Sequence, residues 1–432
     1  MFALPLSAWL EKRGIHYSWL IAALTFLVML SSAASLGLPG VLLTPLTEEM
    51  GWNTAQISTP LAIRFLLFGL MAPFSAIFIN RFGVANIVCV ALALIASGLG
   101  LSVLVTQLWQ LFVVWGLMLG VGSGLTALVL AAVISNRWFT THRGLVIGIL
   151  TASAATGQLA FLPLAAYITG HFGWRAAVLP GMGMCLLLMV LIICFMSDRP
   201  ALLKMRPLGE SPDVPMAAAP VRTPLSLFGP FRVLREASRE STFWLLAGTF
   251  FICGLSTNGL IQTHFISLCG DYGLAALPAA SLLAAMGAFD FIGTILSGWL
   301  SDRYDSRKLL FWYYGLRGLS LLWLPHSGFT LLGLSTFALF YGLDWIATVP
   351  PTVKLSSQRF GPERAPVIFG WIFAAHQLGA ATAAFGAGLS RTQLLSYAPA
   401  LYVAGGACLV AAGMAMAIGK HARARRPEPL QA

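Results

Sequence analysis

Apolar stretches of about 20 residues recur along this sequence from one end to the other. A helix of that length crosses the hydrocarbon core of a bilayer, whereas an open strand cannot, because its backbone groups would lack partners there. Only 9% of the residues are charged, against about a quarter in a soluble domain. We therefore predict an all-α membrane protein with twelve transmembrane helices, at 17–42, 57–79, 84–105, 109–135, 144–168, 176–196, 242–266, 277–300, 309–325, 329–352, 365–389 and 395–418.

One polar stretch divides six of these spans from the other six. It contains the run GESPDVPMAAAP, whose prolines and small residues are typical of a flexible linker. Two six-helix halves with a site between them at mid-membrane are a known plan for secondary transporters. The predicted domains are an N-terminal half at 1–197, a cytoplasmic linker at 198–240, a pseudo-symmetric C-terminal half at 241–419 and a basic tail at 420–432.

The basic residues predict the orientation of the chain. If both termini are cytoplasmic, all but four of the 26 Lys and Arg residues lie in cytoplasmic segments. The exceptions are Arg175 and Arg391 in outer loops, and Arg64 and Arg317 within the membrane. The net charge of +11 is thus explained by orientation in a lipid bilayer rather than by nucleic acid. We expect a multi-pass protein of a cell membrane, of the bacterial inner-membrane kind.

The six cysteines suggest neither a disulfide framework nor a metal site, because none forms a C-x-x-C pair. No clustered catalytic set is visible either, so we expect neither an enzyme nor a cofactor. The predicted partners are a small-molecule solute, protons and lipid, and we expect a monomer.

Four charged side chains fall well inside apolar spans: Arg64, Asp290, Arg317 and Asp344. Each costs about 2.5–3.5 kcal/mol at the centre of a membrane helix. Two are positive and two are negative, so the set can neutralise itself. Charges in such positions mark the path of a solute or an ion by default.

A loop after the eighth span carries Gly298, Asp302, Arg303 and Arg307 in the sequence G-W-L-S-D-R-Y-D-S-R-K. It resembles the cytoplasmic G-x-x-x-D-R-x-G-R-R loop of the major facilitator superfamily, with Asp305 in place of the second glycine. The copy after the second span, N-R-F-G, is degraded. The resemblance implies a gating role for this loop and a rocking of the two halves.

A narrower resemblance covers most of the N-terminal half. The stretches 45–58 (PLTEEMGWNTAQIS) and 136–149 (NRWFTTHRGLVIGI), and Gly173, Trp174 and Arg175, are similar to the monocarboxylate transporter and oxalate/formate antiporter families. Asp290 matches a membrane aspartate of the former. The resemblance implies proton-coupled transport of a small organic anion.

The sequence departs from these families where they hold the anion. Thr294 stands where an arginine is expected one turn after Asp290, and the first and eleventh spans lack a lysine. An anion must therefore be held by Arg64 or Arg317, or else the solute is not a simple anion. Arg64 has no obvious acidic partner in its own half, which favours binding of an anionic group.

Several candidate residues have two interpretations each. Asp290 shares a helical face with small polar residues that either line a water-filled path or pack helices together. Asp344 is either a proton or substrate group, or a structural partner of Arg317. His376 either exchanges protons or packs in the interior. The candidate solute contacts are Arg64, Asn258, Gln262, Gln377 and Tyr341, and the candidate proton-coupling or ion-pair residues are Asp290, Asp344, Arg317 and His376.

We therefore expect secondary active transport of a small organic solute by alternating access. Uptake of a monocarboxylate-like anion with protons is the first choice. The alternatives are a carrier of a vitamin or an aromatic metabolite, an exporter of a drug-like metabolite, and a receptor built on a transporter scaffold, for which no signalling domain is visible.

Overall fold

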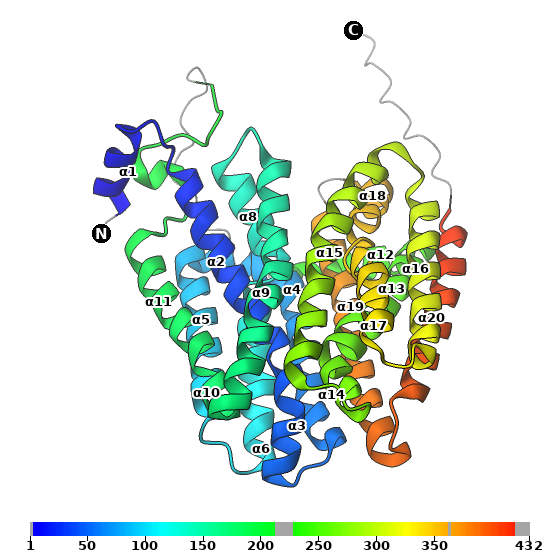
Figure 1. The fold of residues 1–432 in the computed structure, drawn as a ribbon. Coiled ribbons are helices and arrows are strands. Elements are labelled where there is room, and N and C mark those ends of the chain that lie inside the picture. The colour runs from blue at the N-terminus through cyan, green and yellow to red at the C-terminus, as the bar shows by residue number, and fades with distance from the viewer. Residues whose placement is uncertain (1–2, 212–227, 362–363, 420–432) are drawn as a thin grey trace.

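The computed structural model describes residues 3–211, 228–361 and 364–419. Those residues are almost entirely helical, with one isolated bridge between Phe139 and Leu208. Figure 1 shows two helical bundles side by side, with α1 (Ala3–Glu11) and the end of α20 on one side of the molecule and α3 and α6 on the other. We call these the α1 side and the α3 side. The basic tail at 420–432 lies outside the described residues.

Six spanning segments form the N-terminal bundle, and each corresponds to one predicted span. They are α2 (Ser18–Gly37) with α3 (Pro39–Met50); α4 (Thr54–Phe82); α5 (Val84–Ser102); α6 (Leu108–Leu111) with η1 (Phe112–Leu119), α7 (Gly120–Leu125) and α8 (Leu128–Trp138); α9 (Arg143–Phe172); and α10 (Trp174–Ala177) with α11 (Leu179–Phe195).

Six more spanning segments form the C-terminal bundle. They are α13 (Ser241–Gly254) with η3 (Leu255–Gln262) and α14 (Thr263–Asp271); α15 (Ala276–Arg303); α16 (Ser306–Trp323) with η4 (Leu324–His326); α17 (Leu331–Leu343) with α18 (Val349–Phe360); α19 (Ala365–Leu394); and α20 (Ala398–Ala417). The prediction of twelve transmembrane helices in two halves is confirmed.

Four of the twelve segments are irregular near their middle: the first, fourth, seventh and tenth. The first is interrupted between α2 and α3, where Pro39 begins the second helix. The fourth and seventh contain the π-helical stretches η1 and η3. The tenth is interrupted by five residues, 344–348, between α17 and α18. Interrupted helices commonly surround the site of a transporter, and π-helical turns often occur at functional sites.

The two bundles meet where glycine lets helices approach closely. A Cβ added to Gly69 of α4 would lie 2.6 Å from the Cβ of Gln377 on α19. A Cβ added to Gly40 of α3 would lie 2.8 Å from the carbonyl oxygen of Gln262. Real Cβ atoms essentially never come so close, so both positions require glycine. The halves are therefore in contact along α4 and α19, along α9 and α15, and between α3 and the continuous stretch of η3 and α14.

The linker between the halves contains a folded element, whereas the sequence predicted a flexible segment. Helix α12 (Gly229–Ala237) lies just before α13, and its Pro230 carbonyl accepts a hydrogen bond from Trp371 Nε1 at 2.9 Å. Its Phe231 ring lies 5.4 Å from both Phe74 of α4 and Trp371 of α19. This helix therefore contacts both halves. Residues 212–227 of the linker lie outside the described part.

Candidate functional site

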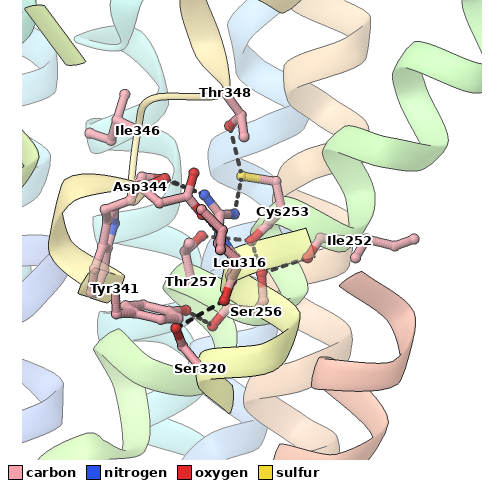
Figure 2. Close-up of polar contacts among 12 residues, drawn as sticks. Ile252, Cys253, Ser256, Thr257, Leu316, Ser320, Tyr341, Asp344, Ile346 and Thr348 are labelled. Carbon is pink, nitrogen blue, oxygen red and sulfur yellow. Dashed lines mark hydrogen bonds and ion pairs between the residues drawn. The ribbon is translucent and has the colours of Figure 1, made fainter. Parts of the chain in front are cut away.

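Arg317 and Asp344 form a buried ion pair in the C-terminal half, as the sequence allowed. Arg317 Nε donates to Asp344 Oδ2 at 2.8 Å, and both residues are buried. The same guanidinium also donates to the backbone carbonyls of Asp344 and, at 3.1 Å, of Trp345. Two of its three nitrogens thus bond the interrupted part of the tenth segment, and Figure 2 shows these contacts around Asp344.

The third nitrogen of Arg317 contacts a residue that we did not single out from the sequence. Arg317 Nη1 donates to Cys253 Sγ at 3.0 Å, and the same sulfur lies 3.3 Å from Thr348 Oγ1. Cys253 lies at the end of α13, so this contact joins the seventh, ninth and tenth segments (Figure 2). In the sequence it was only one of six cysteines in or beside apolar spans.

Asp290 lies on α15 against the same interruption but has no cationic partner. Its Oδ1 accepts from the backbone N–H of Ile346 at 2.7 Å and from Thr294 Oγ1 at 3.0 Å. The residue is 2% exposed. Among the described residues, no basic nitrogen forms an ion pair with its carboxylate. Asp290 and Asp344 therefore differ in kind, since one is paired with an arginine and the other is not.

The polar face of α15 packs against the interruption between α17 and α18. Ser297 Oγ donates to the carbonyl of Ala347 at 2.5 Å. A Cβ added to Gly293 would overlap the carbonyl of Leu343. Gly293 and Ser297 thus pack on the tenth segment, and Asp290 adds a buried charge there. That this face lines a water-filled path stays a prediction.

Tyr341 uses its hydroxyl group within the protein. Tyr341 Oη donates to the carbonyl of Ser256 at 2.6 Å, and the side chain is fully buried (Figure 2). The bond joins α17 to η3 and satisfies a carbonyl in the π-helical stretch. In this conformation Tyr341 fixes the seventh segment against the tenth rather than presenting a free hydroxyl.

Arg64 is buried in the N-terminal half and touches carbonyl oxygens instead of a carboxylate. Its Nη1 donates to Ser35 O at 3.2 Å, and its Nη2 donates to Leu36 O at 3.0 Å, both at the end of α2. Its Nε has no hydrogen-bond partner among the residues that the structure describes. Within the described part of the chain, no acidic side chain pairs with it. The sequence-based expectation that Arg64 lacks an acidic partner agrees with this geometry.

Two glutamines lie where the bundles meet, and both have unused hydrogen-bonding groups. Gln262 is 2% exposed and Gln377 is 1% exposed, and neither amide oxygen nor amide nitrogen of either has a partner among the described residues. Buried polar atoms without partners are rare in native structures and require an explanation. Asn258 lies on the same π-helical stretch as Gln262 and is only half-buried.

His376 lies in an aromatic environment. Its ring is 5.0 Å from Phe250 and 5.7 Å from Phe373, and its side chain lies beside the Cys253 thiol. The backbone of His376 lies against Gly254, where an added Cβ would overlap its carbonyl oxygen. Packing thus accounts for the position of this histidine, and its predicted role in proton exchange stays a prediction.

The loop after α15 is held by Asp305, the residue that replaces the family glycine. Asp305 Oδ1 accepts from the backbone N–H of Arg307 and from its Nε, both at 3.0 Å, so it caps α16. Arg307 also donates to the Ile418 carbonyl at 3.2 Å. These hydrogen bonds from Arg307 lower the pKa of Asp305 below its usual value. The sequence predicted that Gly298, Asp302 and Arg303 lie in this loop, but the structure places them in the last turns of α15. There Arg303 stacks 4.0 Å above the Trp299 ring, and Asp302 is exposed.

In the corresponding loop of the N-terminal half, an amide takes the place of the carboxylate. Asn80, at the place of the family aspartate, accepts from Arg137 Nη2 at 2.6 Å. Gly83 then turns the chain with φ of 90°, and Asp198 Oδ1 accepts from the backbone N–H of Val84 at 2.6 Å. The degraded copy therefore still joins the second, third, fourth and sixth segments on the α1 side. Among the described residues, no group of three His, Cys, Asp or Glu side chains could hold a metal ion.

Residues 24–384 match the family model of the Major Facilitator Superfamily. The chain belongs to this superfamily and is a membrane transporter, not an enzyme. It is 24% identical over 387 residues to the uncharacterized MFS-type transporter YcxA of Bacillus subtilis (strain 168), covering 88% of this chain and 89% of that protein. It is 27% identical over 346 residues to monocarboxylate transporter 13 of Bos taurus, covering 79% of this chain and 75% of that protein.

Solved transporters share the fold. A D-xylose-proton symporter superposes with a TM-score of 0.70 at 13% identity, covering 92% of this chain and 97% of that one. A bacterial homologue of the human lysosomal transporter Spinster, in an inward-facing and unoccupied conformation, gives a TM-score of 0.67 at 14% identity, covering 93% and 95%. At such identities the likeness establishes the fold alone.

Proposed function

We propose that this transporter carries a small organic anion, of the monocarboxylate kind, together with a proton. Several relatives with 23–27% identity are named monocarboxylate transporters, which supports this class of solute. The proposed coupling is uptake by alternating access, with the two bundles rocking about a site between them.

One observation carries the proposal: among the described residues, each half contains one buried charged side chain that forms no ion pair. In the described structure, Arg64 bonds only carbonyl oxygens, and Asp290 bonds only uncharged donors. A buried charge without a counter-charge is costly. An anionic solute beside Arg64 and a proton on Asp290 would neutralise both at once. Asp344 already has Arg317, so Asp290 is the proposed proton carrier.

The proposed hydrogen-bonding contacts to the solute are Asn258, Gln262 and Gln377. The two glutamine amides are buried without partners at the contact between the bundles. That contact must open and reform as the halves rock, which would bring these amides to a solute. The Tyr341 hydroxyl is occupied by Ser256, so we assign Tyr341 a supporting role in holding η3.

The α1 side is proposed to face the cytoplasm of a bacterial cell, since most of the Lys and Arg residues fall in segments assigned to it. In this conformation α3 and η3 are in contact on the opposite side. The proposed gate on the α1 side is the loop with Gly298, Asp302, Arg303 and Arg307, and its hydrogen bond to Ile418 ties it to the end of α20.

The test is uptake of radiolabelled acetate, lactate and benzoate into vesicles that contain the purified protein. We expect at least one of these anions to accumulate when the outside is acidic, and to stop accumulating when a protonophore removes the gradient. Equal steady-state accumulation with and without the gradient would contradict proton coupling. A thermal-shift screen in which only neutral or cationic compounds bind would contradict the anionic solute.

The role of Arg64 has its own test, the Arg64→Gln variant. Loss of one member of a buried charge pair costs about 2–5 kcal/mol of binding, so the apparent affinity for the transported anion should fall about 30-fold or more. Arg391→Gln is the matched control, because Arg391 lies at the far end of α19, paired with Asp271. An Arg64→Gln variant with unchanged affinity would remove Arg64 from the site.

A further inference from the structure

Pro39 leaves a carbonyl of the first segment without its helical partner. In a regular helix the carbonyl of Ser35 would accept from the N–H of residue 39, which proline lacks. Arg64 Nη1 of α4 donates to that carbonyl at 3.2 Å, and Nη2 donates to the next carbonyl, Leu36 O, at 3.0 Å. A side chain of the second segment thus replaces the missing backbone donor.

Pro351 does the same in the tenth segment. The carbonyl of Ala347 would accept from the N–H of residue 351, which is again a proline. Ser297 Oγ of α15 donates to that carbonyl at 2.5 Å. Ser297 is fully buried. The donor again comes from the neighbouring helix of the same half.

The two helices that supply these donors, α4 and α15, occupy equivalent places as the second members of the two halves. Within each half, a helix that runs unbroken for 28 or 29 residues completes the hydrogen bonding of an interrupted neighbour. In both cases the bond joins side chain to backbone and can break without unwinding a helical turn. The continuous helix therefore provides a support about which the interrupted one can bend.

We propose that the first and tenth segments each bend at a proline during transport, and that Arg64 and Ser297 are positioning residues for these two hinges. The predicted effect on the rate of transport rests on the transport function proposed above. The predicted effects on melting temperature and hydrogen exchange do not. Ser297 touches no proposed solute contact. Its loss should therefore lower the maximal rate of transport and leave the apparent affinity for the solute unchanged.

The test is a double-mutant cycle of Ser297→Ala and Pro351→Ala in the full-length protein. In the wild-type background, Ser297→Ala leaves a buried carbonyl without a donor, so the melting temperature in detergent and the maximal rate of acetate, lactate or benzoate uptake should both fall. We expect about a tenfold loss of rate, which corresponds to about 1.4 kcal/mol. In the Pro351→Ala background residue 351 regains its N–H, so Ser297→Ala should cost much less.

Ser301→Ala is the matched control. Ser301 lies one turn further along the same buried face of α15, and its hydroxyl has no partner in the described structure. It should have the melting temperature of the wild type. An equal loss of melting temperature in Ser297→Ala and Ser301→Ala, or a loss from Ser297→Ala that is the same in both backgrounds, would overturn the proposal.

Hydrogen exchange of residues 344–352 provides a measurement that needs neither a solute nor the proline variant. Ser297→Ala should speed exchange in this stretch, and Ser301→Ala should not; identical exchange in both would overturn the proposal. In the first segment, Pro39→Ala should restore the melting temperature of Arg64→Gln without restoring anion binding. If Pro39→Ala does not restore the melting temperature, the hinge at Pro39 is overturned. If the protein does not transport the proposed anions, these melting and exchange results should still be observed.

Discussion

Arg64 and Arg317 are both buried arginines, yet their surroundings give them different roles. Arg317 has a bond for each of its nitrogens, including the carboxylate of Asp344. Arg64 has two carbonyl partners and a free Nε. A carbonyl dipole stabilises a cation less than a full charge does. The charge of Arg64 is therefore available to an anion in the N-terminal half, whereas Arg317 joins helices of the C-terminal half.

The two membrane aspartates should respond differently to removal of their charge. Asp344→Asn leaves Arg317 without its buried partner and should cost about 3–5 kcal/mol of stability. Asp290→Asn retains an oxygen that accepts from Ile346 N–H and breaks no ion pair, so it should change stability by about 1 kcal/mol or less. Chemical unfolding of both variants in detergent measures the difference. Equal losses would show that Asp290 is also held by a strong charge pair.

At this scale the sequence predicted part of the site. The positions of Arg317, Asp290 and Asp344 within apolar spans could be read from the sequence, but the sequence left open whether Arg317 pairs with Asp290 or with Asp344. Cys253 could not be found, because its contact with Arg317 depends on how three helices face one another. The bond between Tyr341 and Ser256 was hidden for the same reason, since it crosses 85 positions of the chain.

Among the elements, the tenth segment differs most from a regular helix. Residues 344–348 interrupt it. Side chains of α15 and α16 form hydrogen bonds with backbone groups of this stretch that have no partner within a regular helix. Pro350 and Pro351 begin the helix that follows this interruption. The π-helical stretch η3 contains no proline, and a window of average hydropathy does not register a change of helical pitch. Hydropathy therefore predicted the spans but not their internal irregularities.

The loop between α15 and α16 provides an element-scale test. Asp305→Asn keeps an oxygen to cap α16 but removes the charge that faces Arg307. Because the folded-state pKa of Asp305 is lowered, its charge adds stability above the unfolded value of about 3.9. That contribution is lost as the pH falls through the lower folded value.

The Asp305→Asn variant should therefore be less stable than the wild type at neutral pH, by about 0.5 kcal/mol for so exposed a pair. The difference should disappear in strong acid. Unfolding in detergent at a series of pH values measures it, with Asp302→Asn, an exposed position in the last turn of α15, as the control. A difference that grows on acidification would contradict the assigned sign.

At the scale of the whole molecule, contact between α3 and η3 keeps the halves together on the α3 side. Gly40 permits this contact because it has no Cβ. Gly40→Ala should push α3 away from the Gln262 carbonyl at a cost of about 1–3 kcal/mol, since the opposing atom is backbone and cannot move aside. The population should shift toward a conformation in which this side is open.

Hydrogen exchange of residues 39–50 and 263–271 measures that shift and should become faster in Gly40→Ala. Gly170→Ala is the control, because an added Cβ at Gly170 of α9 would meet no atom within 4 Å. If both variants exchange like the wild type, the contact at Gly40 does not hold the halves together.

The most direct test of the account is the proton flux that accompanies the solute. Vesicles containing the protein and an internal pH indicator should acidify when acetate, lactate or benzoate is added outside under conditions where the lipid alone shows no change. In Asp290→Asn vesicles the solute should still bind, but its addition should no longer move protons. A wild-type protein that transports solute without acidification, or an Asp290→Asn variant that acidifies at the wild-type rate, would contradict the assignment of Asp290 as the proton carrier.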